Sequence, residues 1–371
     1  MMELNDRYSK NVLVCPLDWG LGHATRLVPV ISEFLNRGCK VALAVGARHK
    51  AFFRKEFGSK VAYYDYPGKK ITFSTGGIFF LKLLYELPLM IISVLREHIY
   101  LKKIVREFNP DIIISDNRYG ACSKTAKSIF VTHQLFIRLP YLLRWLSATV
   151  NFVNQFLISR FDACWIPDNR EQPGLSGELS HRQYPGKKFF VGPLSRFDNL
   201  QIATIPPDAI ALPDKYILVI LSGPEPQRTT FENEIVARLQ SMPAVIFRGL
   251  PESNAFRQKG VHCLIDHPSK ELMAHCLQNC SLVISRSGYS TIMDLSVYGS
   301  KVVFIPTPGQ PEQEYLAMLY HQVGHAVSLG QSMIHKLPEA IDRAITTRGL
   351  PVTKNNGTLS AQVEAILMDL K

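Results

Sequence analysis

The sequence predicts an α/β fold with two Rossmann-like, doubly wound domains facing each other across a cleft, and three observations support this. The chain has 371 residues, more than one domain of about 100–200 residues usually holds. Short β-rich runs alternate with helical stretches in both halves, as in parallel sheets joined by crossover helices. An apolar content of 46% with 20% charged residues is typical of an ordered globular protein.

The first half begins with a strand, a glycine-bearing turn and a helix. Residues 12–16 are β-rich, residues 18–23 form the turn, and residues 26–37 have helical periodicity that ends at Gly38. A strand at 40–45 then completes a βαβ unit, whose parallel strands need a crossover helix. Further strands are predicted at 61–64, 111–115, 128–132 and 163–167.

A proline-rich stretch without helical periodicity separates the halves. We predict a first domain over 1–195, a linker over 196–214 and a second domain over 215–371, whose last helix either stays in it or packs back on the first domain. In open α/β sheets ligands bind at the carboxyl ends of the strands. The strands of the second half are predicted at 216–221, 244–248, 263–265, 282–285 and 301–305.

The formal net charge of +11 favours negatively charged partners, namely nucleotide diphosphates, anionic lipid headgroups or nucleic acid. The basic residues are dispersed and no nucleic-acid-binding motif is present, so we expect no nucleic acid partner. Seven scattered cysteines without a Cys-x-x-Cys pair fit a reducing cytoplasm. The polar N-terminus lacks the apolar core of a secretory signal, so we expect a cytoplasmic protein.

The most apolar segment, 78–95, is interrupted by Lys82, Glu86 and Pro88, which argues against a membrane span. Two interpretations stay open for it: a helix lying on an anionic membrane surface, or a helix buried between the lobes. The basic residues around this segment are Lys69, Lys70, Arg96, Lys102, Lys103 and Arg106.

Small and hydroxyl-bearing residues crowd the junction between the strand at 282–285 and the next helix, predicted at 292–298. Free backbone N–H groups and the positive end of the helix dipole suit a diphosphate, although an ordinary capping sequence would look similar. The candidate donor-binding residues are Arg286, Ser287, Gly288, Ser290 and Thr291. Carboxylates and amides follow in Asp294, Gln313 and Glu314, where they suit the hydroxyls of a ribose and a sugar.

This part of the chain resembles the donor domain of MurG-type N-acetylglucosaminyltransferases and of UDP-glycosyltransferases, which have the GT-B fold. The resemblance lies in Ser-Arg-Ser-Gly, in the acid of the following helix and, after the next strand, in Pro followed by Gln-Glu. The resemblance implies that Asp294 binds the nucleotide ribose and that Gln313 and Glu314 bind the donor sugar. Asp replaces the usual Glu here and Glu replaces the second amide, which leaves the sugar open. By position in the family, Ser222 and Gly223 contact phosphates or form a simple turn, Arg196 reaches the donor, and Asp266 contacts the base.

The first half resembles the acceptor side of the same family. Gly20 and Gly22 form the first loop, and His23 follows it at the end of a strand, where we interpret it as a general base and not as a structural histidine. Asp116 ends another strand and resembles the acid that orients this histidine in many UDP-glycosyltransferases. The pair His133 and Gln134 resembles a His-Glu-Gln segment on the acceptor side.

Taken with the resemblance, these residues predict an inverting, metal-independent glycosyltransferase without a cofactor. It would move a hexose or N-acetylhexosamine from a nucleotide-diphosphate sugar, UDP-linked, to a hydroxyl of a lipid-linked or glycan acceptor at the inner face of the cytoplasmic membrane. The alternatives are a nucleotide-sugar epimerase of the same fold and a non-catalytic nucleotide-sugar-binding protein. A zinc site is disfavoured by the irregular spacing of His262, Cys263, His267, His275, Cys276 and Cys280.

Overall fold

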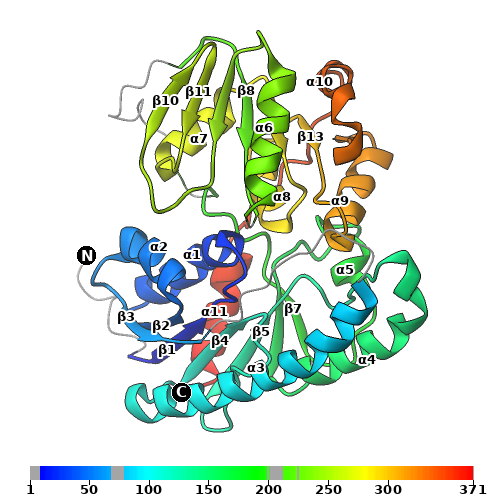
Figure 1. The fold of residues 1–371 in the computed structure, drawn as a ribbon. Helices are drawn as coiled ribbons and strands as arrows, with labels where there is room; N and C mark the ends of the chain where they lie inside the picture. The colour runs from blue at the N-terminus through cyan, green and yellow to red at the C-terminus, as the bar shows by residue number, and fades with distance from the viewer. Residues whose placement is uncertain (1–8, 68–78, 199, 201–211, 224, 371) are drawn as a thin grey trace. The chain divides into compact units, whose positions relative to one another are not determined.

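The computed structural model describes residues 9–67, 79–198, 200, 212–223 and 225–370, with 79–91 as main chain only (Figure 1). The chain divides into two compact units. Unit 1 comprises Met1–Leu194 together with Asn355–Lys371, and unit 2 comprises Ser195–Lys354. The last segment of the chain is therefore part of the first unit. Most of the predicted linker, 199 and 201–211, lies outside the described residues, as do Lys69 and Lys70.

Over the described residues of unit 1, seven parallel strands form one sheet in the order β3-β2-β1-β4-β5-β6-β7. The strand order reverses between β1 and β4, and such a reversal is where open α/β sheets bind ligands. The strands are β1 (Asn11–Cys15), β2 (Lys40–Val45), β3 (Ala62–Asp65), β4 (Ile112–Asp116), β5 (Lys127–Val131), β6 (Ala163–Ile166) and β7 (Lys188–Phe190). The helices are α1 (Leu21–Asn36), α2 (Ala47–Phe57), α3 (Phe79–Phe108), η1 (Tyr141–Leu146), α4 (Ser147–Ile158), α5 (Glu178–His181) and α11 (Thr358–Met368).

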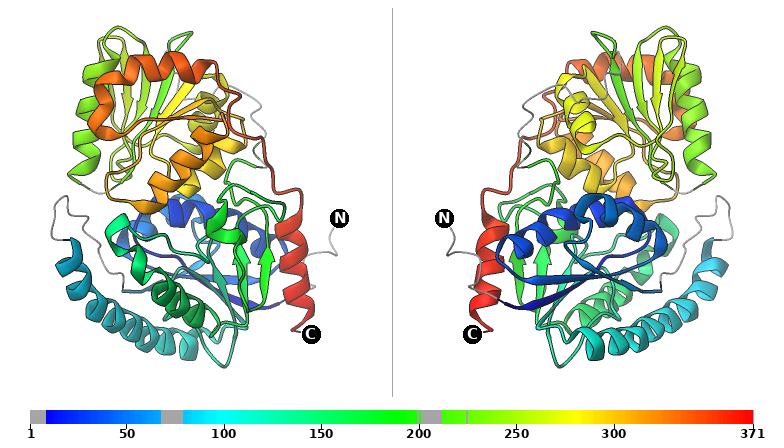
Figure 2. Two further views of the ribbon diagram at one scale, coloured as in Figure 1. Left: turned by 90° about the vertical axis from the view of Figure 1, so that its right-hand side faces the viewer. Right: turned by 90° about the vertical axis from the view of Figure 1, so that its left-hand side faces the viewer.

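Helices α3 and α4 cover the same face of the unit 1 sheet (Figure 2). The paired residues Cys15, Ser115 and Phe130 of β1, β4 and β5 share that face. Leu101 of α3 belongs to the apolar cluster around Cys15, and Ile158 of α4 belongs to the cluster around Phe130. Burial of these alternating strand residues explains why the β-rich runs in the sequence predicted the sheet.

Unit 2 contains a second sheet, which has seven strands over the described residues in the order β10-β11-β9-β8-β12-β13-β14, with β10 antiparallel to β11. The strands are β8 (Ile217–Ile220), β9 (Ala244–Phe247), β10 (Phe256–Lys259), β11 (His262–Ile265), β12 (Leu282–Ser285), β13 (Val302–Phe304) and β14 (Val327–Ser328). The helices are α6 (Gln227–Leu239), α7 (Lys270–Asn279), α8 (Tyr289–Ser296), α9 (Pro311–Gln322), η2 (Gln331–Lys336) and α10 (Leu337–Ile345).

The two doubly wound α/β units confirm the predicted fold class. The sequence analysis missed β7, β10 and β14. Strand β10 is exposed along its whole length and polar after Phe256, so it lacks the apolar alternation on which strand prediction depends. Helix α8 begins at Tyr289 and not at 292, because the chain enters the helix directly after Gly288.

Candidate active site

The carboxyl ends of β1 and β4 bring His23 and Asp116 together in unit 1. His23 is the third residue of α1, and Asp116 is the last residue of β4, the strand that pairs with β1. His23 Nδ1 lies 2.9 Å from Asp116 Oδ2. The His23 side chain is 20% exposed, whereas Asp116 is fully buried. A carboxylate therefore stands behind an imidazole that solutes can reach.

The surroundings of this pair favour a neutral imidazole and an ionised carboxylate. Burial lowers the pKa of His23, Arg26 lowers it further, and Asp116 acts in the opposite direction. Although burial alone would raise the pKa of Asp116, Arg26 and His23 hold it below its ordinary value. Near neutral pH the site thus contains a histidine able to accept a proton and a negative charge able to stabilise the imidazolium.

Arg26 completes the group and was not among the predicted site residues. It is buried, and its Nη2 donates to Asp116 Oδ1. The same Nη2 lies 2.9 Å from His23 Nδ1, and Nη1 lies 3.3 Å from His133 Nδ1. A helical spacing of three residues places Arg26 on the same face of α1 as His23, so the sequence did contain a signal for it.

The other predicted acceptor-side residues lie at the same edge of the sheet, after β1 and β5. The Gly20 carbonyl accepts a hydrogen bond from His49 Nε2 at 3.1 Å. His133 and Gln134 follow β5, and Asn154 of α4 donates to the Gln134 carbonyl at 3.2 Å. Gly22, which lies within α1, is half-buried. Unit 1 therefore gathers its predicted residues around the ends of β1, β4 and β5.

In unit 2, two strand ends bring the predicted phosphate residues to one edge. Ile220 of β8 pairs with Ser285 of β12, so Ser222 and Gly223 follow one strand as Ser287 and Gly288 follow its neighbour. Gly223 has φ 110°, which a side chain would strain.

Helix α8 begins at this edge of the sheet. Gly288 is its N-cap, and a Cβ added there would meet no atom closer than 3.9 Å. Ser290 and Thr291 lie in the first turn, half-buried. Backbone N–H groups at such a helix start favour an anion.

Asp294 is buried one turn further along α8. Its Oδ1 accepts a hydrogen bond from Ser195 Oγ at 2.7 Å, and Arg196 interacts with it electrostatically. Burial raises the pKa of Asp294 to about 6, although Arg196 and Ser195 oppose this. The structure thus groups two predicted donor residues, Asp294 and Arg196, and adds Ser195, which no sequence pattern indicated.

Gln313 and Glu314 occupy the first turn of α9 and organise the loop before it. Gln313 Oε1 accepts from the Thr307 N–H at 2.8 Å, and Glu314 Oε1 accepts from the Gly309 N–H at 3.0 Å. Ser287 Oγ donates to the Gln313 carbonyl at 2.7 Å, which joins this loop to the start of α8. The predicted sugar residues are therefore held beside the predicted phosphate residues.

Arg286 and Asp266, also predicted to bind the donor, are engaged inside unit 2. Arg286 Nη1 donates to the carbonyls of Ile305 and Pro306 at 2.9 and 3.1 Å, and burial lowers the pKa of its guanidinium to about 10. Asp266 accepts from Arg248 at 2.7 Å and from Ser253 at 2.6 Å. These contacts hold both side chains inside unit 2, and their predicted contacts with the donor stay a prediction.

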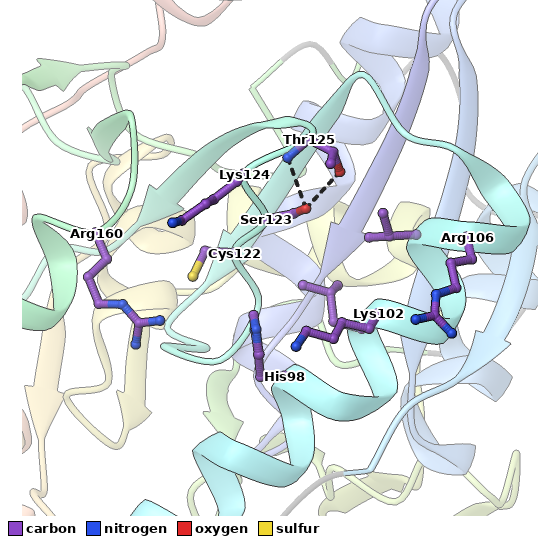
Figure 3. Close-up of a pocket in the computed structure, with 10 residues that line it drawn as sticks. His98, Lys102, Arg106, Cys122, Ser123, Lys124, Thr125 and Arg160 are labelled. Carbon is purple, nitrogen blue, oxygen red and sulfur yellow. Dashed lines mark hydrogen bonds between the residues drawn. The ribbon is translucent and has the colours of Figure 1, made fainter.

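A basic groove of about 690 Å³ lies on unit 1 beside the second half of α3 (Figure 3). It also contains Ser123 and Thr125, whose hydroxyl oxygens lie 2.9 Å apart. None of its lining residues within the described part of the chain is acidic. The five basic residues that line it are His98, Lys102, Arg106, Lys124 and Arg160.

An apolar surface is exposed on the same side of unit 1. On the part of α3 whose side chains are described, the exposed large apolar side chains are Ile92, Leu95, Ile99 and Tyr100. On η1 and α4, large side chains are more than 60% exposed, namely Tyr141, Leu142, Trp145, Phe152 and Phe156. We call this set on η1 and α4 the aromatic surface. Within the described residues, no helix is long and apolar enough to cross a membrane.

The residues considered for zinc do not form a metal site. Across the described ranges, no three His, Cys, Asp or Glu side chains are grouped so that they could hold a metal ion. Cys263 and Cys276 are buried in unit 2, where they behave as small core residues.

Solved structures similar to this chain align with nearly all of its length. MurG from Acinetobacter baumannii aligns with a TM-score of 0.53 at 13% identity, covering 97% of this chain and 99% of that one. Arabidopsis thaliana UGT89C1, complexed with quercetin, aligns with a TM-score of 0.61 at 15% identity, covering 98% of this chain and 95% of that one. The chain has the GT-B fold.

Sequence similarity to known GT-B proteins concentrates in the second half. Residues 258–366 match the family described as Glycosyltransferase family 28 C-terminal domain. A UDP-N-acetylglucosamine–N-acetylmuramyl-(pentapeptide) pyrophosphoryl-undecaprenol N-acetylglucosamine transferase of Prochlorococcus marinus is 42% identical over 67 residues, 18% of each protein. A protein of the same name from Trichormus variabilis is 38% identical over 72 residues, and the match spans 20% of its length. The resemblance predicted from the donor motifs is thereby confirmed.

Proposed function

We propose that this chain is an inverting, metal-independent glycosyltransferase that takes a sugar from a nucleotide diphosphate held by unit 2. The observation that carries the proposal is the His23–Asp116 pair at the carboxyl edge of the unit 1 sheet. A binding protein needs no such base. The similarity of residues 258–366 to a glycosyltransferase C-terminal domain supports unit 2 as the donor unit.

In the proposed reaction His23 Nε2 takes the proton of an acceptor hydroxyl while that oxygen attacks the anomeric carbon of the donor. The bond between this carbon and the diphosphate oxygen breaks, and inversion follows from the single displacement. Asp116 stabilises the imidazolium that forms. The N–H groups at the start of α8 stabilise the charge of the leaving diphosphate, which assigns this task to the protein and not to a metal ion.

The names of the relatives support a choice of donor and acceptor class. Both curated relatives are named for UDP-N-acetylglucosamine and for an undecaprenol-linked acceptor. We therefore propose a UDP-linked hexose or N-acetylhexosamine as donor. A lipid-linked acceptor is favoured over a soluble glycan because unit 1 exposes the aromatic surface and, on α3, several basic residues.

A two-step assay tests the activity. A panel of nucleotides and nucleotide sugars is first screened by thermal shift, because a ligand at a hundred times its Kd adds about 2.7 kcal/mol of stability. The stabilising donor is then incubated with the protein alone and with polyprenyl-diphosphate sugar acceptors. Transfer that requires an acceptor supports the proposal. Conversion of the donor alone would identify an epimerase, and binding without either reaction would identify a nucleotide-sugar-binding protein.

The same proposal places unit 1 at an anionic membrane surface of the cytoplasmic side. Each Lys or Arg close to an anionic leaflet contributes about 1 kcal/mol, and exposed aromatic side chains insert at the headgroup boundary. On α3, the exposed basic residues are Arg96, Lys102, Lys103 and Arg106.

Co-sedimentation with phosphatidylglycerol vesicles tests this placement. We expect binding that salt weakens, and a several-fold loss of bound protein in Lys102→Glu with Lys103→Glu and in Trp145→Ser with Phe152→Ser. The controls are Lys259→Glu and Phe256→Ser on β10 of unit 2, which should bind normally. Absence of wild-type binding would favour a soluble acceptor.

A further inference from the structure

We propose that Arg26 is a positioning residue for the proposed transfer reaction. Its guanidinium links Asp116 and His133 around His23 and balances the Asp116 carboxylate, so that the imidazole begins each reaction as a neutral base. The inference rests on the proposed function in one respect, the role of His23 as the base. No catalytic contact with substrate is assigned to Arg26.

The geometry shows a guanidinium built into the site. Arg26 is 2% exposed, although arginine is seldom buried without a specific partner. One nitrogen, Nη2, serves Asp116 Oδ1 and lies 2.9 Å from His23 Nδ1. The other, Nη1, reaches His133 Nδ1 at 3.3 Å, and since a guanidinium cannot accept, this His133 nitrogen accepts. Arg26 therefore connects the residue pair after β1 and β4 to the loop after β5.

The hydrogen bonds also fix which nitrogen of His23 is free. A carboxylate accepts and does not donate, so a hydrogen bond to Asp116 Oδ2 at 2.9 Å places the proton on His23 Nδ1. Arg26 Nη2, which also lies 2.9 Å from this nitrogen, then donates to Asp116 Oδ1 and not to His23. The lone pair of the neutral ring then lies on Nε2, as a base needs. Arg26 occupies the other carboxylate oxygen and keeps Asp116 from turning away, which is a positioning effect.

The charges around His23 show why a cation is needed there. The titratable and charged groups that face it are Arg26 of α1, Asp116 of β4, His133 after β5 and His49 of α2. Burial lowers the pKa of His23, whereas the Asp116 carboxylate raises it and so favours the protonated imidazole, which cannot accept a proton. Arg26 offsets that carboxylate and leaves the proton site empty until the acceptor hydroxyl delivers its proton.

The first experiment measures the pKa of His23 directly, by NMR titration of labelled histidine. Replacing Arg26 with glutamine should raise the pKa of His23 by about one pH unit, because a nearby cation is lost. Arg26→Lys should stay close to wild type. The matched control is Arg118→Gln, which removes the other large buried arginine of unit 1, paired with Glu97 at 3.1 Å, without touching His23. An unchanged His23 pKa in Arg26→Gln would overturn the inference.

The second experiment separates this inference from the proposed function. In Arg26→Gln, the acidic limb of the pH profile of kcat/KM for transfer should move to higher pH. A purely structural defect would instead lower kcat/KM equally at all pH values. A raised pKa of His23 with an unmoved profile would support the inference about Arg26 and refute His23 as the base. Should Arg26→Gln not fold, Asp116→Asn is compared with Asp116→Asn plus Arg26→Gln. The double variant should have the higher His23 pKa, and equal values would overturn the inference.

Discussion

The two side chains most important to the proposal, His23 in unit 1 and Asp294 in unit 2, differ in exposure and in their hydrogen bonds. His23 is partly exposed and hydrogen-bonded to Asp116, which suits the role of general base proposed for it. Asp294 is buried and accepts a hydrogen bond from Ser195. A ribose that binds Asp294 through its hydroxyls would compete with this hydrogen bond, and the burial that raises the pKa of Asp294 to about 6 makes its charge sensitive to pH.

Replacing His23 with alanine should abolish the proton transfer and leave donor binding intact. We expect a loss of about a hundredfold or more in kcat, as for removal of a general base, with an unchanged Kd for UDP. Steady-state kinetics and calorimetry measure the two quantities. His275→Ala on α7, whose ring nitrogen contacts Asn279, is the control and should keep full activity. Normal turnover in His23→Ala would remove this residue from the mechanism.

Replacing Asp294 with asparagine should separate stability from binding. Because the pKa of Asp294 in the folded protein lies above its ordinary 3.8, its contribution to stability is present below pH 3.8 and is lost as the pH rises through about 6. The neutral variant avoids this loss, so its Tm at pH 7.5 should equal or exceed that of wild type. UDP binding at that pH should weaken about tenfold, since a charged hydrogen bond is worth about 1.5–3 kcal/mol.

The pH dependence of binding gives a second measurement on the same variant. Because the terminal phosphate of UDP also gains a proton at about pH 6, the comparison is between the two proteins. Wild-type affinity for UDP should fall more steeply below about pH 6 than that of Asp294→Asn, since Asp294 gains a proton there as well. Asp342→Asn, at an exposed position of α10, is the control and should behave as wild type. Equal affinity of both proteins at pH 7.5 would contradict a ribose contact.

The sequence indicated residue types and strand ends well, but not which partner each side chain takes. His23 follows a buried strand and Asp116 ends another, which is why their meeting could be predicted. Arg286 also follows a strand, yet its guanidinium binds the Ile305 and Pro306 carbonyls, which no local pattern reveals. Ser195 contacts Asp294 across 99 positions of sequence, a separation at which spacing carries no information.

At the scale of elements, the loop between β6 and α5 is organised by one buried carboxylate. Asp168 Oδ1 accepts from the N–H groups of Asn169 and Leu175, both at 2.7 Å. Its Oδ2 accepts from the N–H and hydroxyl of Ser176 at 2.9 and 2.6 Å and from Ser180 at 3.2 Å. The loop lacks an apolar pattern, so its order could not be predicted from hydrophobic periodicity.

Replacing Asp168 with alanine should destabilise unit 1 more than any surface change. Several buried donors would lose their acceptor, and each unsatisfied group costs about 1–3 kcal/mol. We expect a fall in Tm of several degrees, measured by calorimetry. Asp65→Asn is the control. The Asp65 side chain, which pairs with Lys50, is 86% exposed, and exposed ion pairs contribute little to the free energy of unfolding. Equal Tm values for the two variants would show that the loop does not depend on Asp168.

At the scale of the whole molecule, unit 2 is inserted into unit 1. The chain leaves unit 1 after Leu194 and returns at Asn355. Asn355 Nδ2 donates to the carbonyls of Val191 and Pro193 at 2.7 and 3.1 Å, so the departing and returning segments are joined inside unit 1. Helix α11 then packs against α1, where Arg37 Nη2 donates to the Ser360 carbonyl at 3.0 Å.

A charge on the buried side of α11 should therefore destabilise α1, against which this helix packs. Val363 is fully buried, and an unpaired carboxylate there would cost more than about 4 kcal/mol. In Val363→Asp we expect fast hydrogen exchange in α1 and reduced His23-dependent activity, with slow exchange kept in α8. Val352→Asp is the matched control, since Val352 is 66% exposed. Protected amides in α1 of Val363→Asp would show that α11 is dispensable for unit 1.

The late position of α11 also sets an order of events on the ribosome. At about 5–20 residues per second, α11 emerges on the order of ten seconds after the rest of unit 1, because all of unit 2 is translated between them. During that interval the surface of α1 beside Arg37, which α11 covers in the folded protein, faces solvent or a chaperone. Unit 2 is by then completely synthesised and able to fold. The nascent chain would then complete unit 2, the proposed donor unit, before the unit that holds His23.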